Sequence, residues 1–138
     1  LFRDTVAQMG RLIRIQGNFK RQEIHSRLLE KYGNHSTIPR CADRIAQTLV
    51  DWQILQKNKT TNYSSSSHQI TSQKIQTWFL EACIFASPNQ RLLLDDVYQL
   101  PELFPFEFKI DIRRLVTDGE YLRCERDGNN LEYVVGHR

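Results

Sequence analysis

The chain has 138 residues, of which 40% are hydrophobic and 25% are charged, and its formal net charge at pH 7 is +3. This length suits one ordinary domain or two very small ones, and the composition excludes a disordered chain. No apolar run approaches the roughly 18–20 residues of a membrane-spanning helix, so a membrane partner is not expected. The first residues are charged and begin a helical pattern, which predicts no signal peptide, and a start at Leu1 is compatible with a piece of a longer protein.

The three cysteines, Cys41, Cys83 and Cys124, are widely spaced and form no Cys-x-x-Cys pair. An odd number of cysteines without a framework predicts reduced, mostly buried thiols and a cytoplasmic protein, or a nuclear one in a eukaryote. Ligation of a metal by these cysteines and a histidine lacks the usual ligand spacing, so neither a metal site nor a cofactor is predicted.

Charge is distributed unevenly between the two halves of the chain. Residues 1–70 contain eleven Lys and Arg against five Asp and Glu, a net charge of +6. Residues 71–138 contain eight Lys and Arg against eleven Asp and Glu, a net charge of −3. A polyanion is therefore expected to be attracted to the first half and weakly repelled by the second.

The chain begins with the pattern of an amphipathic helix. Over residues 2–15 apolar side chains recur at steps of three and four residues, and Gly17-Asn18 ends this helix. Phe19 is predicted to be a brief extended residue that enters the core. A second helix follows over Arg21–Tyr32 and stops at Gly33-Asn34.

The next helix, Thr37–Trp52, has a clear start, because Ser36 or Thr37 can cap it and Pro39 lies in the first turn, where proline is tolerated. The periodicity predicts one face directed into the core, formed by Ile38, Cys41 or Ala42, Ile45, Leu49 and Trp52. The opposite face is polar and carries Arg40, Asp43, Arg44, Gln47, Thr48 and Asp51.

A short strand, Gln53–Gln56, and a polar hairpin are predicted after this helix. The return strand of the hairpin is weakly marked within Asn62–Ile70. The serines Ser64–Ser67 have no apolar content to bury. They belong either to the tip and return of a long hairpin or to a flexible linker.

A similar series of elements restarts at Ser72. Its first helix carries a wide, aromatic-rich strip that is predicted to be buried and is formed by Ile75, Trp78, Phe79, Ala82, Cys83, Phe85 and Ala86. A short strand over Arg91–Leu93 leads to a brief helix, Asp95–Leu100, and to a turn over Pro101–Pro105.

The second series ends with a helix and two strands. The spacing predicts a helix over Phe106–Asp118. Two alternating strands, Tyr121–Arg126 and Leu131–Val135, are joined by Asp127–Asn130, in which the Asp-Gly pair is a hairpin signal.

Both halves therefore repeat one order: a helix, a turn, a second helix, and two strands joined by a hairpin. In this order the chain resembles the winged helix-turn-helix superfamily, over Arg21–Trp52 with the following hairpin and over Asp95–Val135. The resemblance lies in the order of elements and includes no motif specific to one family. It implies a mainly α fold with small β-hairpins (α+β), built as two tandem winged helix-turn-helix domains at residues 1–70 and 71–138. It also implies DNA recognition as the commonest function and protein–protein contact as the second.

In a helix-turn-helix, the second helix of the pair places its first turns in the major groove of DNA. On Thr37–Trp52 these turns carry Arg40 and Arg44, which can bind guanine, and Gln47, which can bind adenine. Hydroxyl groups at the helix start and lysines in the hairpin can reach phosphates or the minor groove. The predicted DNA-binding residues are Ser36, Thr37, Arg40, Arg44, Gln47, Lys57, Lys59, Lys20 and Arg21.

An alternative interpretation assigns no ligand to this face. Arg40 with Asp43, and Arg44 with Thr48 or Asp51, then form i,i+3 and i,i+4 pairs on a solvated helix. The two acids would also repel a phosphate backbone.

The second half is expected to bind DNA less well. The predicted helix Phe106–Asp118 begins with Glu107, Lys109 and Asp111 and is basic only later, at Arg113 and Arg114. Carboxylates in the leading turn repel phosphates. Residues 71–138 are therefore expected to support the first domain, to form a homodimer or to dock another protein.

No enzyme is predicted, because the chain has no Gly-x-Ser-x-Gly, no phosphate-binding Gly loop and no His-Glu-x-x-His helix. The four histidines lack a cysteine or acid at catalytic spacing. The preferred function is a non-catalytic DNA-binding protein, similar to a transcriptional regulator, that contacts duplex DNA through Thr37–Trp52. The alternatives are a protein-interaction adaptor in a larger, DNA-processing complex and a regulatory segment of a larger enzyme.

Overall fold

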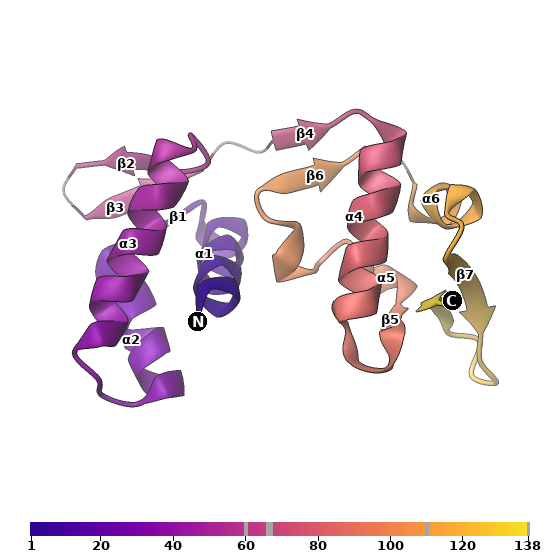
Figure 1. Ribbon diagram of the computed structural model, residues 1–138, viewed down its shortest axis with the longest axis horizontal. Helices are drawn as coiled ribbons and strands as arrows, with labels where there is room; N and C mark the ends of the chain where they lie inside the picture. The colour runs from indigo at the N-terminus through magenta and orange to yellow at the C-terminus, as the bar shows by residue number, and fades with distance from the viewer. Residues whose placement is uncertain (60, 66–67, 110, 138) are drawn as a thin grey trace. The chain divides into compact units, whose positions relative to one another are not determined.

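The computed structural model describes residues 1–59, 61–65, 68–109 and 111–137. It is an α+β structure in which helices are combined with small antiparallel sheets (Figure 1). The chain divides into two compact units, unit 1 at Leu1–His68 and unit 2 at Gln69–Arg138. Within the described ranges, no helix is both long enough and apolar enough to cross a lipid bilayer.

Unit 1 contains three helices and a three-stranded sheet. Its elements are α1 (Phe2–Gln16), β1 (Asn18–Lys20), α2 (Arg21–Tyr32), α3 (Thr37–Asp51), β2 (Gln56–Asn58) and β3 (Asn62–Ser64). The strand order is β1-β3-β2, and β3 is antiparallel to both neighbours. The last of these strands along the chain, β3, is therefore the central strand of the sheet.

Glycines end the first two helices. Gly17 has a φ of 78° and its N–H donates to Ile13 O at 2.8 Å, so α1 stops in a left-handed residue and the chain reverses into β1. Gly33 ends α2 with a φ of 85°. The extended residue predicted between these helices is confirmed, because Phe19 lies in β1, is buried, and stacks on Tyr63 of β3 with ring centroids 5.2 Å apart.

The end of α3 differs from the prediction. Trp52 was expected in the core, but its exposed fraction is 62%. The chain turns at Gln53, which has a φ of 60°, and Leu55 enters the core instead. The N–H groups of Ile54 and Leu55 both donate to Leu49 O, at 2.9 and 3.1 Å. The predicted strand Gln53–Gln56 was therefore wrong, since this stretch is mostly a turn and β2 begins at Gln56.

The return strand of the hairpin is β3, within the weakly marked range Asn62–Ile70. Ser64 belongs to this strand, and the Ser65 hydroxyl donates to Ile54 O at 2.6 Å. The remaining two serines of the predicted tip or linker, Ser66 and Ser67, lie outside the described residues.

Unit 2 has a three-stranded sheet of the same connectivity. Its main elements are α4 (Gln73–Ala86), β5 (Arg91–Leu93), α5 (Leu94–Val97), α6 (Ile112–Asp118), β7 (Leu122–Arg126) and β8 (Glu132–Gly136). The strand order is β5-β8-β7, again with the last strand in the centre. Two short 3₁₀ turns, Pro88–Gln90 and Pro101–Leu103, and a small sheet of β4 (His68–Ile70) with β6 (Phe106–Phe108) complete it.

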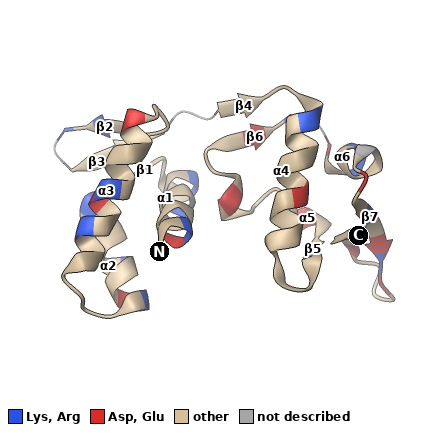
Figure 2. Ribbon diagram, viewed as in Figure 1, with Lys and Arg blue, Asp and Glu red and all other residues tan. Residues whose placement is uncertain are grey.

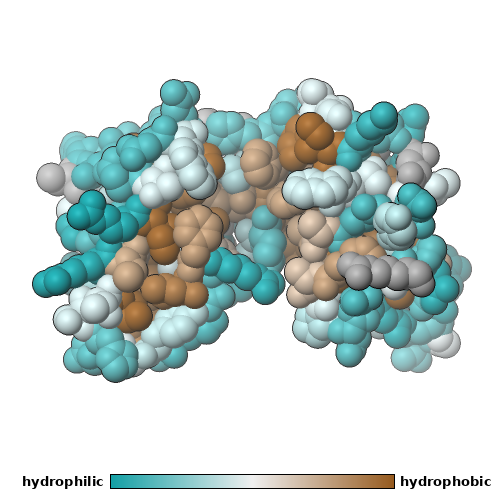
Figure 3. Space-filling model, in the orientation of Figure 1, coloured by the Kyte–Doolittle hydropathy of each residue, from teal (hydrophilic) through white to brown (hydrophobic). Residues whose placement is uncertain are grey.

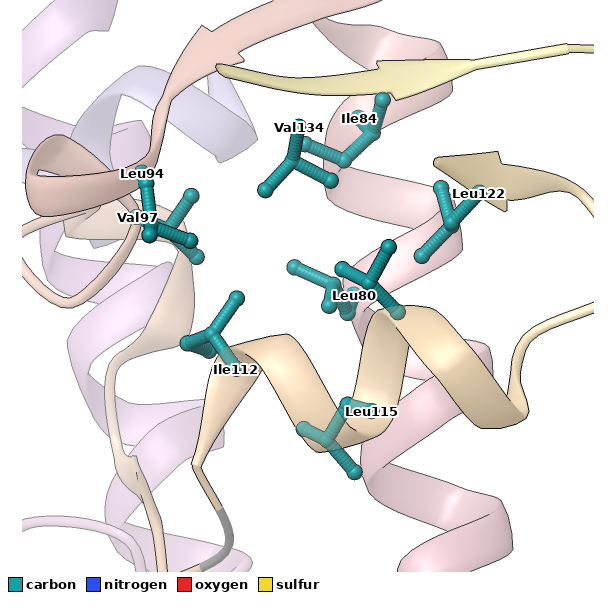
Figure 4. Close-up of a cluster of buried hydrophobic side chains, with 9 residues drawn as sticks. Leu80, Ile84, Leu94, Val97, Ile112, Leu115, Leu122 and Val134 are labelled. Atoms are coloured by element: carbon teal, nitrogen blue, oxygen red, sulfur yellow. The ribbon is translucent and has the colours of Figure 1, made fainter. Parts of the chain in front are cut away.

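The core of unit 2 is formed by aliphatic side chains from α4, α5, α6 and the sheet, several of which converge in Figure 4. Its members are Leu80, Ile84, Leu94, Val97, Ile112, Leu115, Val116, Leu122 and Val134. On α4 the buried row is Gln76, Leu80 and Ile84, and the Gln76 amide donates to Ile70 O at 2.6 Å. The amide is therefore buried without losing its hydrogen bond.

The predicted inner face of α4 was partly wrong. Ile75 is 52% exposed and Trp78 is 66% exposed, although both were expected in the core. Apolar side chains occur on nearly every side of this helix, so periodicity does not identify the buried side. The position of the sheet and of α6 selects the Leu80 side.

The predicted helix Phe106–Asp118 is much shorter than expected. Phe106 to Phe108 form β6, whose rings meet Phe79 of α4 edge to face at centroid distances of 5.7 and 5.8 Å. The helix begins only at Ile112, and Asp111 caps it by accepting from the Arg113 N–H at 2.8 Å. Likewise, the predicted helix Asp95–Leu100 is the single turn of α5.

Candidate nucleic-acid interface

α3 buries one face against α1 and α2 and leaves the opposite face in solvent. Ala42, Ala46 and Leu49 are buried. Because the small side chains of Ala42 and Ala46 allow close approach, the helix lies tightly on its neighbours. Arg40 and Arg44 are exposed, as the periodicity predicted.

The two arginines are one helical turn apart and therefore point to the same side of α3. Within the described part of the chain, neither guanidinium forms an ion pair or a hydrogen bond. The Arg40–Asp43 pair of the alternative interpretation does not form. Thr48 donates to the backbone oxygen of Arg44 at 3.0 Å and leaves the Arg44 side chain untouched.

Asp43, the acid between these arginines, is engaged by α2. Arg21 Nε donates to Asp43 Oδ1 at 2.7 Å, and Arg21 Nη2 pairs with Asp43 Oδ2. His25 Nε2 lies 2.8 Å from Asp43 Oδ1. Arg21 and His25 are also one turn apart, on the face of α2 that meets α3. We call these three residues the Asp43 cluster.

The electrostatics of the cluster favour the charged form of Asp43. Partial burial alone would raise the pKa of this carboxyl, but the hydrogen bonds from Arg21 and His25 outweigh burial and lower the pKa below its ordinary value of 3.8. The carboxylate is therefore ionised and compensated inside unit 1. The acid that would most directly oppose a polyanion on α3 is balanced by α2.

The sequence offered no acid at catalytic spacing from His25, and the structure supplies one from α3 through this tertiary contact. In the sequence, this contact is indicated only by the i,i+4 spacing of Arg21 and His25, which places both basic side chains on one face of α2. The spacing cannot identify Asp43 as the partner, because Asp43 lies on another helix.

The start of α3 is open to solvent. Ser36 and Thr37 are exposed, and the Ser36 side chain makes no capping hydrogen bond. Ser36 was a predicted cap, so this part of the expectation is not met. The Ile38 N–H donates to His35 O at 3.0 Å and Pro39 has no N–H, so an anion at this helix start would meet mainly the hydroxyl groups of Ser36 and Thr37.

Gln47 lies one turn beyond Arg44 and is exposed. Its amide nitrogen donates to Asp51 Oδ1 at 2.8 Å, so the far end of this face carries an acidic residue that is hydrogen-bonded to Gln47. The basic character of the face is concentrated in the first two turns of α3.

Lys20 and Arg21 lie where β1 joins α2, and both are exposed. The Lys20 N–H donates to Glu23 Oε2 at 2.6 Å, and the Arg21 N–H donates to Thr61 O at 2.9 Å. The second bond holds the start of α2 beside the β2–β3 hairpin. Lys20 keeps its ammonium group in solvent, whereas Arg21 belongs to the Asp43 cluster.

The β2–β3 hairpin is short. Lys57 is exposed on β2 opposite Tyr63, and Lys59 follows the strand with a φ of 56°. Tyr63 fixes the hairpin to the core through its stack on Phe19. In Figure 2 the basic positions of α3 and of this hairpin lie toward the same side of unit 1, and those of α1 lie toward the other side.

On α6, the corresponding helix of unit 2, Arg114 is exposed but Arg113 is engaged by an acid. Arg113 and Arg126 both pair with Glu132, and Glu107 lies in β6 rather than in a helix. The hydrogen bonds from Arg126 and Arg113 lower the pKa of the Glu132 carboxyl. A cavity of about 270 Å³ beside these groups is therefore lined by charges that balance each other.

The three cysteines are not joined by disulfides. Cys41 and Cys83 are half-buried and Cys124 is exposed, so the prediction of mostly buried thiols was wrong. In the part of the chain that the structure describes, no group of three or more His, Cys, Asp or Glu side chains is placed to hold a metal ion. The α3 face with the adjoining hairpin is therefore the strongest candidate site of the described chain.

Comparisons with protein-family models, with curated proteins and with solved structures find no match to this chain.

Proposed function

We propose that unit 1 is a winged helix-turn-helix domain that binds duplex DNA, without catalysis, through the first two turns of α3. The observation that carries the proposal is the pair Arg40 and Arg44, exposed one turn apart and without an ion pair among the described residues. The Asp43 cluster removes the opposing charge between them.

The order of elements supports this proposal. In α1-β1-α2-α3-β2-β3 the pair α2 and α3 supplies a helix-turn-helix, and β2 with β3 supplies a short wing. In this arrangement α3 is the recognition helix. A helix of its width fits the major groove, where arginine can bind guanine O6 and N7 with two hydrogen bonds.

Charge supports the same surface. Unit 1 carries the whole +6 of residues 1–70, because Gln69 and Ile70 are uncharged, and unit 2 carries −3. A duplex would therefore approach unit 1. The hydroxyl groups of Ser36 and Thr37 can bind a phosphate, while Lys20, Lys57 and Lys59 can bind the flanking backbone.

Arg21 has a different part in this proposal. It was among the predicted DNA-binding residues, but its guanidinium holds Asp43 in place. We assign Arg21 to positioning α3 on α2 and to neutralising Asp43. Unit 2 is not assigned to DNA, because its net charge is −3 and Arg113 and Arg126 are both paired with Glu132.

Fluorescence anisotropy with a labelled random duplex tests the proposal. Arg40→Ala combined with Arg44→Ala should weaken binding at least about tenfold at low salt, because two cations that can contact phosphates are removed. Affinity should also fall steeply as salt is raised. The matched control is Lys109→Ala combined with Arg114→Ala, which removes the same charge from exposed positions of unit 2.

Equal loss in the two double variants would mean that α3 is not the contact surface. Absence of duplex binding at low salt would reject DNA binding and leave the adaptor interpretation.

A further inference from the structure

One helix face of unit 2 is apolar and uncovered. Ile75, Trp78 and Ala82 are exposed on α4, on the side opposite the buried row of Leu80 and Ile84. We call these three exposed residues the α4 stripe. In Figure 3 the surface over α4 is largely brown, tan and pale rather than teal.

The spacing of the α4 stripe is that of a helix–helix contact. Steps of three and four residues along a helix place side chains in one line, as in the seam of a coiled coil. A tryptophan that is 66% exposed beside an exposed isoleucine is a costly surface in water. Tryptophan is also the residue type most enriched among the energetically dominant residues of protein interfaces.

Two charged residues of α4 flank the stripe. Lys74 and Glu81 are seven residues apart, which places them on the same flank of the helix, on either side of Trp78. Neither forms an ion pair within the described residues. In an antiparallel pair of identical helices, side chains of the same flank meet each other, so Lys74 of each copy would face Glu81 of the other.

The apolar residues fit the same register. When two α4 helices cross antiparallel at Trp78, Ile75 of one copy lies within one residue, about 1.5 Å along the axis, of the level of Ala82 of the other, a large side chain beside a small one. The face therefore carries opposite charges and unequal apolar side chains at positions where a second copy can meet them, and a twofold interface requires such self-complementarity.

We propose that a second copy of this chain docks antiparallel on the α4 stripe and forms a symmetric dimer. The helix has 14 residues and is therefore about 21 Å long, so the interface is small and the dimer depends on concentration. The proposal is independent of DNA binding, and its tests contain no nucleic acid.

Sedimentation of the full chain over a range of concentrations is the first test. The mass should rise from that of a monomer to that of a dimer, and Trp78→Lys should remain monomeric. The control is Trp52→Lys, the same substitution at the other exposed tryptophan, which should dimerise like the unaltered chain. A chain that stays monomeric at every concentration, or a Trp78→Lys variant that dimerises normally, overturns the proposal.

Charge exchange tests the antiparallel register. Lys74→Glu and Glu81→Lys should each weaken the dimer roughly tenfold, because each change turns two attractive pairs into two repulsive ones. The variant with both changes should regain the original affinity, and Lys109→Glu, a charge reversal away from the stripe, should have no effect. Failure of the double variant to regain affinity overturns the antiparallel arrangement.

Trp78 fluorescence identifies the occupant of the stripe. In Trp52→Phe the single remaining tryptophan should emit at shorter wavelength in the dimer and shift to longer wavelength on dilution. Short-wavelength emission in a chain that sediments as a monomer would mean that the chain covers its own stripe. Long-wavelength emission at every concentration would leave the stripe for a different protein, and both results contradict the proposal.

Discussion

His25 of α2 lies 2.8 Å, Nε2 to Oδ1, from Asp43 of α3, and this contact joins the two helices of the proposed helix-turn-helix. Asp43 is only partly exposed, and Arg21 binds the same carboxylate. Asp43, one of the two acids of the proposed recognition helix, thereby helps to hold that helix in place. The negative charge of Asp43 would repel DNA if it were unpaired, but here it binds Arg21 and His25 and fixes α3 on α2.

The first prediction concerns this contact. A double-mutant cycle with His25→Ala and Asp43→Ala should give a coupling free energy of about 0.5–1.5 kcal/mol. Either substitution alone already removes the hydrogen bond between these partly buried groups, so the second substitution cannot remove it again. The free energies of unfolding are measured in urea by circular dichroism. The control cycle pairs His25→Ala with Asp51→Ala, whose carboxylate contacts Gln47. Additive effects for His25 and Asp43 would contradict the assigned contact.

The second prediction concerns pH and the junction of α1 with α2. Hydrogen bonds from Lys31 and Tyr32 lower the pKa of the Asp4 carboxyl below its ordinary value of 3.8. A lowered folded-state pKa contributes stability above the unfolded-state pKa, and this contribution is lost as the pH falls through the folded-state value. Asp4→Asn should therefore be less stable than the unaltered chain at about pH 7, and the difference should shrink progressively as the pH falls below the ordinary carboxyl value of 3.8.

The measurement is the free energy of unfolding of both proteins over this pH range. Glu30→Gln, at an exposed carboxylate of α2, is the control and should differ little from the unaltered chain throughout. A difference for Asp4→Asn that stays constant with pH would show that the loss does not come from ionisation.

The third prediction concerns the approach of β8 to α4. A Cβ at Gly136 would lie 2.8 Å from the ring of Phe85, which is closer than two carbon atoms normally approach. Gly136→Ala should therefore destabilise the protein by about 1–3 kcal/mol, the usual cost of overpacking. Gly128→Ala, at the hairpin tip with nothing within 4 Å, should change stability by less than about 0.5 kcal/mol. Equal stabilities of the two variants in urea would contradict the packing of Phe85.

The fourth prediction distinguishes the two faces of α4. Leu80→Ala should cost about 2–5 kcal/mol, because it leaves a cavity in the core of unit 2. Ile75→Ala should cost less than about 1 kcal/mol in a dilute sample, since this side chain is half exposed. Both free energies of unfolding are measured in urea. If Ile75→Ala lost more stability than Leu80→Ala, the core would lie on the Ile75 side of α4, which contradicts the structure.

Local signals were sufficient for several elements. Helix Arg21–Tyr32 and strand Arg91–Leu93 have the predicted bounds, and α3 begins at Thr37 as predicted. Glycine, proline and hairpin residues act on the backbone within a few positions, so their effect can be read along the chain. The alternation of Arg40 and Arg44 with apolar positions likewise placed both arginines on the outer face.

Long-range packing determined the remainder. Phe106 and Phe108 fit a helical pattern, but they form β6 and meet Phe79 of α4. Trp78 fits a buried strip, but it lies outside because the sheet and α6 occupy the opposite side of α4. In each case the deciding partner is far along the chain, where periodicity carries no information.

The candidate site shows the same division. A helix of 3.6 residues per turn sets which side chains share a face, and that geometry is local to the chain. The neutralisation of Asp43 depends on Arg21 and His25, which are 22 and 18 residues away. Ion pairs between helices form only when packing brings two elements together, so the charge that α3 presents to solvent follows from its contact with α2.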